Sequence, residues 1–265
     1  MSLLSARHIT LGYPQNGDTN TVLRDFSLEV QEGELIGLMG PSGVGKSSLL
    51  RVLAGLAKPL AGEVALFGKP LAKPHPRLGF VFQQAALLPW LNVRDNVAFG
   101  LDFQSQPDLS RAERKTRVDE AIEEVGLAHA ADMFPSELSG GMAQRVSLAR
   151  VLARNPEVWL LDEPFSALDA VTRTEMQDLL RTLITRHNAS AVMVTHDIDE
   201  ALILADRAIL IGNKPGRQIG EWRLQQPYPR HDALLEMNQE RVEILQALRN
   251  AHGHKRQVET VEFVI

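Results

Sequence analysis

One eight-residue segment constrains the fold of this chain more than any other. Residues 40–47 read Gly-Pro-Ser-Gly-Val-Gly-Lys-Ser, which matches the pattern G-x-x-x-x-G-K-[ST]. An apolar run at residues 35–39 precedes the segment, and an apolar stretch that we expect to be helical, residues 46–56, follows it. Backbone N–H groups approach a polyphosphate closely only where glycines leave room or allow positive φ. The segment therefore predicts a strand, a phosphate-binding loop and a helix in succession.

Lys46 and Ser47 complete this predicted phosphate site. The lysine supplies a positive charge between the outer phosphates of a nucleotide, and the serine hydroxyl is a ligand for Mg²⁺. The N-terminus of the helix adds its partial positive charge. With glycine at about 7% of residues, a chance match in a chain of this length is expected only about 0.01 times. The pattern thus predicts nucleotide binding.

Five short, almost continuously apolar runs predict the core of the fold: residues 35–39, 78–82, 158–161, 191–194 and 208–211. Strands of this kind are buried on both faces, as in parallel sheets covered by helices. Helical patterns lie between them, and residues 176–184 repeat apolar side chains at i, i+3, i+4, i+7 and i+8. The alternation predicts a parallel α/β architecture.

Two regions depart from this alternation. Residues 9–30 alternate more loosely around a turn-rich segment at 14–18 and predict antiparallel strands joined by a hairpin. Residues 85–154 read mostly helical, and within them Ser110 and Glu113 form a capping-box pattern that predicts the start of a helix. A last helix is expected at about residues 233–250. We therefore expect one domain over residues 1–265, with a nucleotide-binding core that includes the antiparallel strands (1–84 and 155–225), a helical subdomain (85–154), and a C-terminal helix and tail (226–265).

Asp162 and Glu163 follow the apolar run at residues 158–161. Open α/β sheets bind ligands at the carboxyl ends of their strands, where this pair is expected to lie. A phosphate site needs a carboxylate for the metal and a group that activates water, and we assign Asp162 to the first role and Glu163 to the second. By itself such a pair serves equally well as a helix cap or as two solvated charges. The phosphate loop favours the catalytic interpretation.

Two further segments extend the pattern. Leu138-Ser139-Gly140-Gly141 precedes a predicted helix, and Val194-Thr195-His196-Asp197 ends another predicted strand. With these segments the chain resembles the nucleotide-binding subunits of ABC transporters over nearly its whole length. The motifs of that family correspond, in the family's order, to residues 40–47 (Walker A), Gln83 (Q-loop), 138–144 (signature), 158–163 (Walker B), 166–169 (D-loop) and His196 (switch histidine).

The resemblance implies an α/β P-loop NTPase core of the RecA-like type, with a mostly parallel sheet, an antiparallel β subdomain and an inserted α-helical subdomain. It also implies ATP and Mg²⁺ as cofactors, with Ser47, Gln83 and Asp162 at the metal. Glu163 is then the general base, while His196 contacts the γ-phosphate and Gln83 links the metal to the helical insertion. ATP contacts are implied for Tyr13, which stacks on adenine, and for Gly40, Pro41, Ser42, Gly43, Val44, Gly45, Lys46, Ser47 and Ser48.

In this family two copies dock head to tail and enclose two ATP molecules. The resemblance therefore implies a homodimer in which Ser139, Gly140 and Gly141 of one copy act on ATP held by the other, with Asp169 at the dimer seam. The signature departs from the family's common Leu-Ser-Gly-Gly-Gln, because Met142 occupies the fifth position. The expected contacts come from the Ser139 hydroxyl, backbone N–H groups and the helix N-terminus, so they need no glutamine. Members resembling nitrate and sulfonate importers share the replacement.

Residues 87–97 and 227–230 resemble importers of nitrate, sulfonates, taurine and thiamine precursors. The resemblance implies a subunit that binds and hydrolyses ATP to energise import of a small oxyanion or organic solute, such as an aliphatic sulfonate, taurine or nitrate. Its implied location is the cytoplasmic face of the inner membrane, as a peripheral protein bound to integral permease subunits and served indirectly by an extracytoplasmic solute-binding protein. Leu88 and Trp90 either contact the permease or pack inside the helical insertion. A lipid-moving or export system remains the alternative.

Charge and composition argue against other classes of protein. The formal net charge of −5 provides no basic footprint for nucleic acid. Lys46 and Ser139 are 139 − 46 = 93 residues apart with no heptad run between them, which disfavours relatives that act on chromosomes or ribosomes. No apolar run approaches the roughly 20 residues that cross a bilayer, and no export signal is visible. The chain has no cysteine, which excludes disulfides, thiolate zinc sites and cysteine nucleophiles.

Overall fold

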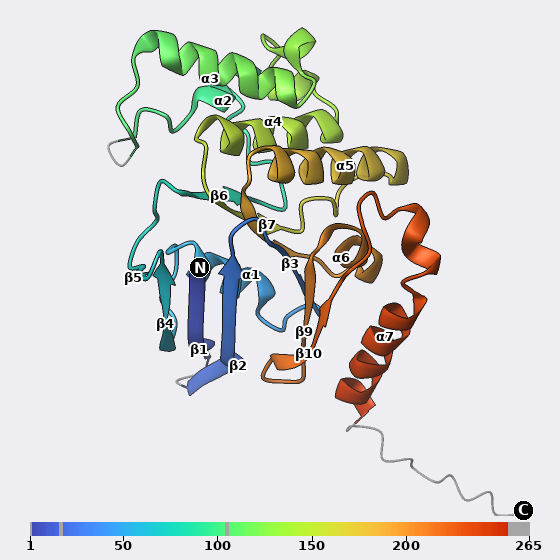
Figure 1. Cartoon of the computed structure of the whole chain (residues 1–265). Helices are drawn as coiled ribbons and strands as arrows, with labels where there is room; N and C mark the ends of the chain where they lie inside the picture. Colours follow the sequence, from blue (N-terminus) through green and yellow to red (C-terminus); the bar gives the residue numbers. More distant parts are fainter. Residues whose placement is uncertain (1, 16–17, 104–105, 254–265) are drawn as a thin grey trace, which may run out of the picture.

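Six strands form the central sheet of the computed structural model, which describes residues 2–15, 18–103 and 106–253 (Figure 1). Their order in space is β10-β9-β3-β8-β7-β6. Every neighbouring pair from β9 to β6 is parallel, and β10 runs antiparallel beside β9. Each of the five predicted apolar runs corresponds to a strand of this sheet, with Phe82 of the run 78–82 lying just after β6, so the predicted parallel α/β architecture is confirmed. The bounds are β3 Leu35–Met39, β6 Leu78–Val81, β7 Val158–Asp162, β8 Ser190–Val194, β9 Arg207–Gly212 and β10 Arg217–Arg223.

A second sheet has four antiparallel strands in the order β2-β1-β4-β5. β1 (Ser2–Gln15) and β2 (Asp18–Gln31) pair along their whole length with several register shifts. Residues 16 and 17 of the predicted hairpin turn lie outside the described part of the chain. β4 (Ala61–Leu66) pairs with β1, and β5 (Lys69–Pro70) pairs with β4. The antiparallel strands predicted within residues 9–30 are therefore present, although β1 begins well before residue 9.

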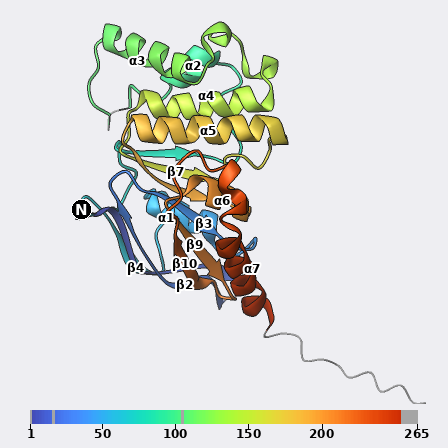
Figure 2. The same ribbon diagram turned by 45° about the vertical axis from the view of Figure 1, so that its right-hand side comes forward.

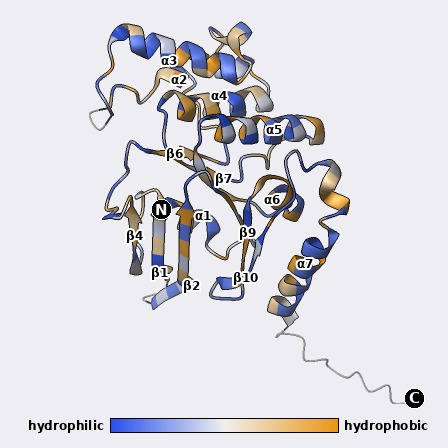
Figure 3. Cartoon of the chain, viewed as in Figure 1, coloured by the Kyte–Doolittle hydropathy of each residue, from blue (hydrophilic) through white to orange (hydrophobic). Residues whose placement is uncertain are grey.

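The central sheet is apolar on both faces because each face has its own cover. In β3, Ile36 and Leu38 belong to a core shared with α1 (Lys46–Leu53) and the four-stranded sheet, whereas Leu35 and Met39 belong to a core shared with helices on the other side. Successive side chains of a strand point to opposite faces. A strand between two cores is therefore apolar at every position, which explains the continuous apolar runs. Figure 2 shows the same ribbon turned by 45°, and Figure 3 shows hydrophobic residues along the central strands.

Most of the chain between β6 and β7 is helical. It contains α2 (Val93–Ala98), α3 (Arg111–Glu124) and α4 (Gly140–Ala153), with 3₁₀ turns at Ala128–Ala130 and Pro135–Glu137. α3 begins with the predicted capping box, in which Ser110 Oγ accepts from the Glu113 N–H (3.2 Å) and the Glu113 carboxylate accepts from the Ser110 N–H (2.9 Å). α4 lies beside α5 (Ala170–Arg186) in Figures 1 and 2. The inserted helices therefore pack against the nucleotide-binding core through the contact between α4 and α5.

Two predicted helix boundaries are wrong. The phosphate-loop helix α1 ends at Leu53 and does not reach residue 56. Gly55 follows with φ +70°, and a Cβ there would lie 2.6 Å from the Lys73 carbonyl carbon, so the chain leaves the helix through a turn that favours glycine. The last helix, α7 (Asn238–Gly253), starts later than residue 233 because a separate 3₁₀ turn at Asp232–Leu235 precedes it.

The remaining helix of the core, α6 (Ile198–Leu204), connects β8 to β9. α7 packs beside α6 and β10 (Figure 1). Within the described ranges, no helix is both long and apolar enough to cross a membrane. Residues 254–265 of the expected C-terminal tail lie outside those ranges.

Candidate functional site

Four parallel strands end at one edge of the central sheet and supply most of the predicted site. In the ladder, Leu38 of β3 lies opposite Val194 of β8, and Val194 lies opposite Asp162 of β7. Val81 of β6 lies opposite Leu161. The chain segments that follow these strands are the phosphate loop and those that carry Gln83, Glu163 and His196. Parallel strand topology alone therefore gathers motifs from Gly40 to His196, which are 196 − 40 = 156 residues apart in sequence.

The phosphate loop is curled around its own lysine. Lys46 Nζ donates to the carbonyl oxygens of Gly40 (2.7 Å) and Pro41 (3.0 Å), and the side chain is buried. Gly40 has φ +147°, and a Cβ there would lie 2.2 Å from the Ile211 carbonyl oxygen. Gly45, at φ +95°, forms the N-cap of α1. These two positions need glycine for backbone shape, which is the requirement that the sequence pattern predicted.

Ser47 and Asp162 bring two oxygen ligands together. Ser47 Oγ donates to Asp162 Oδ1 at 2.7 Å. Burial raises the pKa of Asp162, and the hydrogen bond from Ser47 opposes that shift. Burial also lowers the pKa of Lys46, while the nearby carboxylates of Glu163 and Asp162 raise it. The site thus holds opposite charges in a poorly solvated place, where each stabilises the other.

Glu163 connects three of the predicted site residues. Its Oε2 accepts a hydrogen bond from Gln83 Nε2 (3.3 Å) and lies 3.1 Å from His196 Nδ1. Its backbone has φ +45°, an uncommon conformation for a residue with a side chain, and its N–H donates to the Val194 carbonyl (3.0 Å). Backbone strain of this kind gathers at functional sites, where the surrounding structure enforces it. Glu163 lines the same cavity as the phosphate loop.

A cavity of about 390 Å³ opens at this edge. Tyr13 stands at its rim with half of its surface exposed, and its hydroxyl lies 2.5 Å from Ser48 Oγ. The ring is therefore free to stack against a flat ligand. The cavity is lined by Tyr13, Val22, Ser42, Gly43, Gly45, Lys46, Ser47, Ser48, Gln83 and Glu163. Val22 is the one lining residue that the sequence analysis missed, because nothing distinguishes it from other apolar residues of β2.

The predicted signature and seam residues lie elsewhere. Ser139 caps α4 by accepting from the Met142 N–H (3.2 Å), and Asp169 caps α5 by accepting from the Val171 and Thr172 N–H groups (3.1 Å each). Hydrogen bonds from Thr172 hold the pKa of Asp169 below its usual value. A Cβ on Gly141 would lie 2.5 Å from Thr172 Cγ2, so the starts of α4 and α5 are adjacent. None of the described residues that line the 390 Å³ cavity belongs to either helix.

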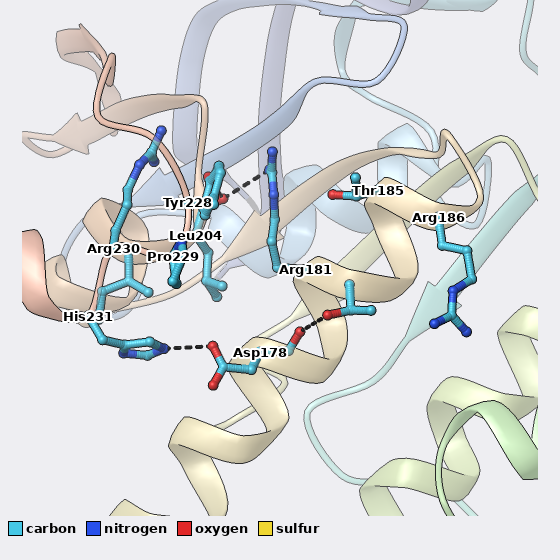
Figure 4. A pocket seen from close by; sticks show the side chains of 11 residues that line it. Asp178, Arg181, Thr185, Arg186, Leu204, Tyr228, Pro229, Arg230 and His231 are labelled. Carbon is cyan, nitrogen blue, oxygen red and sulfur yellow. Dashed lines mark hydrogen bonds and ion pairs between the residues drawn. The ribbon is translucent and has the colours of Figure 1, made fainter.

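A larger cavity, of about 820 Å³, lies away from the strand ends, between α5, the end of α6 and residues 228–231 (Figure 4). Arg181 from its wall pairs with Asp206, and Arg186 pairs with Glu124. His231 lies 2.9 Å from Asp178 across the cavity mouth. These cations therefore already have carboxylate partners, and Arg230 from the same wall donates to backbone carbonyl oxygens. No predicted site residue lines the cavity. The smaller cavity at the strand ends is therefore the candidate site.

Comparisons with known proteins show what the chain is similar to. A family model described as "ABC transporter" matches residues 23–166, which include the phosphate loop and the Asp162–Glu163 pair. The chain is 49% identical over 238 residues to the aliphatic sulfonates import ATP-binding protein SsuB 1 of Xanthomonas axonopodis pv. citri, which covers 88% of this chain and 93% of that protein. It is 48% identical over 221 residues to the nitrate import ATP-binding protein NrtC of Synechococcus elongatus, over 83% of this chain but 33% of that protein.

The fold is similar to that of a solved dimeric structure, the ATP-binding cassette MJ0796 in a post-hydrolysis state bound to ADP and Pi. The TM-score is 0.74 at 34% sequence identity, and the match covers 84% of this chain and 100% of that one. The P-loop NTPase core expected from the sequence is thereby confirmed.

Proposed function

The chain belongs to the ABC transporter family as an ATP-binding subunit with ATPase activity coupled to transport, and we propose that it energises the import of a small oxyanion or organic solute. An aliphatic sulfonate, taurine or nitrate is the proposed cargo, because relatives at nearly half identity carry names of sulfonate and nitrate import proteins. The observation that carries the proposal is the meeting of Lys46, Ser47 and Glu163 on one cavity at the strand ends. Asp162 lies directly behind Ser47, from which it accepts a hydrogen bond.

We propose that the cavity holds ATP, with adenine against Tyr13 and the phosphates against the loop. Lys46 would exchange its two carbonyl partners for phosphate oxygens, and the N-terminus of α1 would add its partial positive charge. Glu163 is positioned by Gln83 and His196 to take a proton from the attacking water. His196 is exposed beside Glu163, where it can contact the γ-phosphate.

The donor set suits Mg²⁺, which prefers hard oxygen ligands such as carboxylates and hydroxyls. Ser47 and Asp162 offer one of each in hydrogen-bond contact, and Gln83 adds an amide at the same cavity. We propose that these three residues hold the ion, which when bound neutralises phosphate charge.

We further propose that the site is completed by a second copy of the chain. Ser139 and Gly140 are exposed at the N-terminus of α4, an arrangement suited to an anion, yet no residue of α4 is among the described residues that line the chain's own cavity. A head-to-tail dimer would bring Ser139, Gly140 and Gly141 onto the partner's ATP and Asp169 to the seam. The similarity to a cassette solved as a dimer supports this arrangement.

An apolar groove beside Gln83 is the proposed contact with integral permease subunits. Phe82, Phe99 and Phe103 line it with about half of each residue exposed, next to Arg150 and Arg154. Aromatic side chains with this exposure favour a protein partner. Trp90 is 69% exposed, so it does not pack inside the helical insertion, and we propose that it belongs to the same contact surface. Permease subunits held here would keep the chain peripheral, on the cytoplasmic face of the membrane, with a solute-binding protein on the other side.

Reconstitution tests this function directly. The chain is purified with its membrane subunits, placed in lipid vesicles, and assayed with ethanesulfonate, taurine and nitrate in the presence of the solute-binding protein. We expect ATP hydrolysis that rises with one of these solutes and uptake of that solute. Hydrolysis that rises instead with lipid or with outward movement of a compound would contradict import and favour the export alternative.

A further inference from the structure

The residue before His196 is held by a buried hydroxyl–carboxylate bond to Glu200, a residue outside the recognised motifs. Thr195 Oγ1 donates to Glu200 Oε2 at 2.6 Å and accepts from the Asp197 N–H at 3.0 Å. Thr195 and Glu200 are both buried. The two peptide neighbours of His196 are therefore fixed through one hydroxyl group, whose orientation is set by Glu200.

The same glutamate faces an arginine from α5. Arg173 Nη2 donates to the carbonyl oxygen of Leu168 at 2.9 Å, next to the proposed seam residue Asp169. Arg173 Nε lies 3.8 Å from Glu200 Oε1, which is ion-pair distance but too long for a hydrogen bond. This Nε is buried and has no hydrogen-bond partner. A small approach of α5 to α6 would convert the contact into a charge-assisted hydrogen bond.

We propose that Glu200 and Arg173 are positioning residues that couple the D-loop at the dimer seam to the switch histidine of the same chain. The physical route runs from Leu168 through Arg173 and Glu200 to Thr195, and then to His196 and its contact with Glu163. The Arg173–Glu200 contact at 3.8 Å is the weakest interaction on this route. Docking of a second copy against Asp169 shifts Leu168 and Arg173 together. This shift shortens the Arg173–Glu200 contact and thereby fixes His196 in position. The inference rests on the proposed function.

The charged surroundings support an electrostatic link. Burial raises the pKa of Glu200, and the Thr195 hydrogen bond and the Arg173 charge oppose this shift. Asp197 raises it further, because its charge lies on the same short helix start. The carboxylate thus depends on Arg173 and Thr195 for stabilisation, and loss of either one would alter how it holds the His196 segment.

A double-mutant cycle with steady-state kinetics tests this coupling. Glu200→Gln and Arg173→Met should each lower kcat by about 3- to 30-fold with the KM for ATP changed less than about 2-fold, as expected for a coupling residue that does not touch ATP. The double variant should be no slower than the slower single variant. Thr195→Val should behave like Glu200→Gln, whereas Thr195→Ser keeps the hydroxyl and should recover activity to within about 2-fold of the unchanged chain.

The Glu34–Arg207 pair provides a matched control. Each side chain of this ion pair is 11% exposed, and its Nε–Oε1 contact is 2.8 Å. The pair lies at the opposite ends of β3 and β9 from the site. Glu34→Gln should lower the thermal midpoint without changing kcat by more than about 2-fold. If the Glu200–Arg173 pair were merely structural, substitutions in it would likewise lower the thermal midpoint and leave kcat nearly unchanged.

The outcomes separate the link from the proposed function. The link would be overturned if the folded Glu200→Gln and Arg173→Met variants kept an unchanged kcat. It would also be overturned if the double variant lost kcat by the product of the two single losses. If Glu200→Gln fails to fold, equal kcat for Thr195→Val and Thr195→Ser overturns it. Each of these results can occur while Glu163→Gln is inactive. In that case the link is rejected, but the proposed ATPase site is still supported. Full activity of Glu163→Gln would instead reject the site on which the link acts.

Discussion

Ser47 Oγ donates a 2.7 Å hydrogen bond to Asp162 Oδ1, which joins the start of α1 to the end of β7 across 115 residues of sequence. The bond keeps a carboxylate in a buried place beside the phosphate loop. Burial raises the pKa of Asp162 from its ordinary value of 3.8. Keeping the Asp162 carboxylate ionised, as metal binding requires, therefore lowers the free energy of unfolding.

Asp162→Asn should stabilise the folded chain at pH 7 by roughly 0.5–2 kcal/mol while reducing ATP hydrolysis severely. The raised pKa means that the folded state binds the proton more tightly than the unfolded state, so stability decreases as pH rises above 3.8 through the folded pKa. The difference between the two proteins should disappear below pH 3.8. Chemical unfolding of both proteins at several pH values measures this difference in the free energy of unfolding.

Asp119 provides the control of opposite sign. Hydrogen bonds from Lys115 and Arg94 hold its pKa below the ordinary 3.8, so its contribution to stability is present above that value and is lost as pH falls. Asp119→Asn should therefore lower stability slightly at pH 7. Equal shifts in both variants would contradict the role of burial at Asp162.

Glu163→Gln should lower kcat by about 10²- to 10⁴-fold, because the carboxylate that accepts the proton from water is replaced by a neutral amide of the same shape. ATP binding should persist, since Lys46 and the loop are unchanged. ATP-dependent dimers should accumulate and be visible by gel filtration. Glu157→Gln, at the other end of the same strand, serves as the control. A wild-type rate for Glu163→Gln would remove this residue from its assigned role.

Local patterns in the sequence predict those parts of the fold that depend on neighbouring residues. The run before Gly40, the glycines at positive φ and the Ser110–Glu113 capping box each depend on neighbouring residues, so each was visible in the sequence. The end of α1 was placed too late because Leu56 continues the apolar pattern, whereas Gly55 ends the helix through a close approach to Lys73. That approach is a tertiary contact, and no local pattern reports it.

The candidate site was likewise predictable only as far as its motifs extend. Gln83 and His196 were found because a family pattern marks them, and Glu163 was found because an acidic pair follows a predicted buried strand. Their contacts at one Glu163 carboxylate oxygen follow from strand order. Thr195 and Glu200 were missed because a buried hydrogen bond between them leaves no periodic signal in the sequence. The Phe99 groove was missed for a related reason, since its walls come from β6, the end of α2 and α4, which are far apart in the sequence.

Mixing two inactive variants tests whether the signature acts in trans. Lys46→Ala should abolish phosphate binding, and Ser139→Arg should obstruct the proposed signature contact, so each protein alone should be inactive. In a random mixture half of the dimers are mixed, and each of these has one intact site of two, which gives about one quarter of the unchanged activity. An arrangement within one chain would leave the mixture as inactive as its components.

Tyr13→Ala should weaken ATP binding by about 5- to 150-fold, because an aromatic stack on a base contributes about 1–3 kcal/mol. Tyr13→Phe keeps the ring and loses only the hydroxyl contact with Ser48, so its affinity should stay within a few-fold of the unchanged chain. Titration with a fluorescent ATP analogue measures both. Equal weakening in the two variants would assign the effect to the hydroxyl and contradict stacking.

Phe99→Ser and Phe103→Ser should uncouple the ATPase from its membrane subunits. Both side chains line the groove beside Gln83 and are about half exposed, so polar replacements remove contact area at little cost to folding. The isolated chain should hydrolyse ATP normally, whereas co-purification with the permease and solute-dependent uptake should fall. Phe134→Ser is the matched control, because Phe134 is 45% exposed but does not line the groove. Loss of permease binding in all three variants would point to general damage, and retention in all three would place the contact elsewhere.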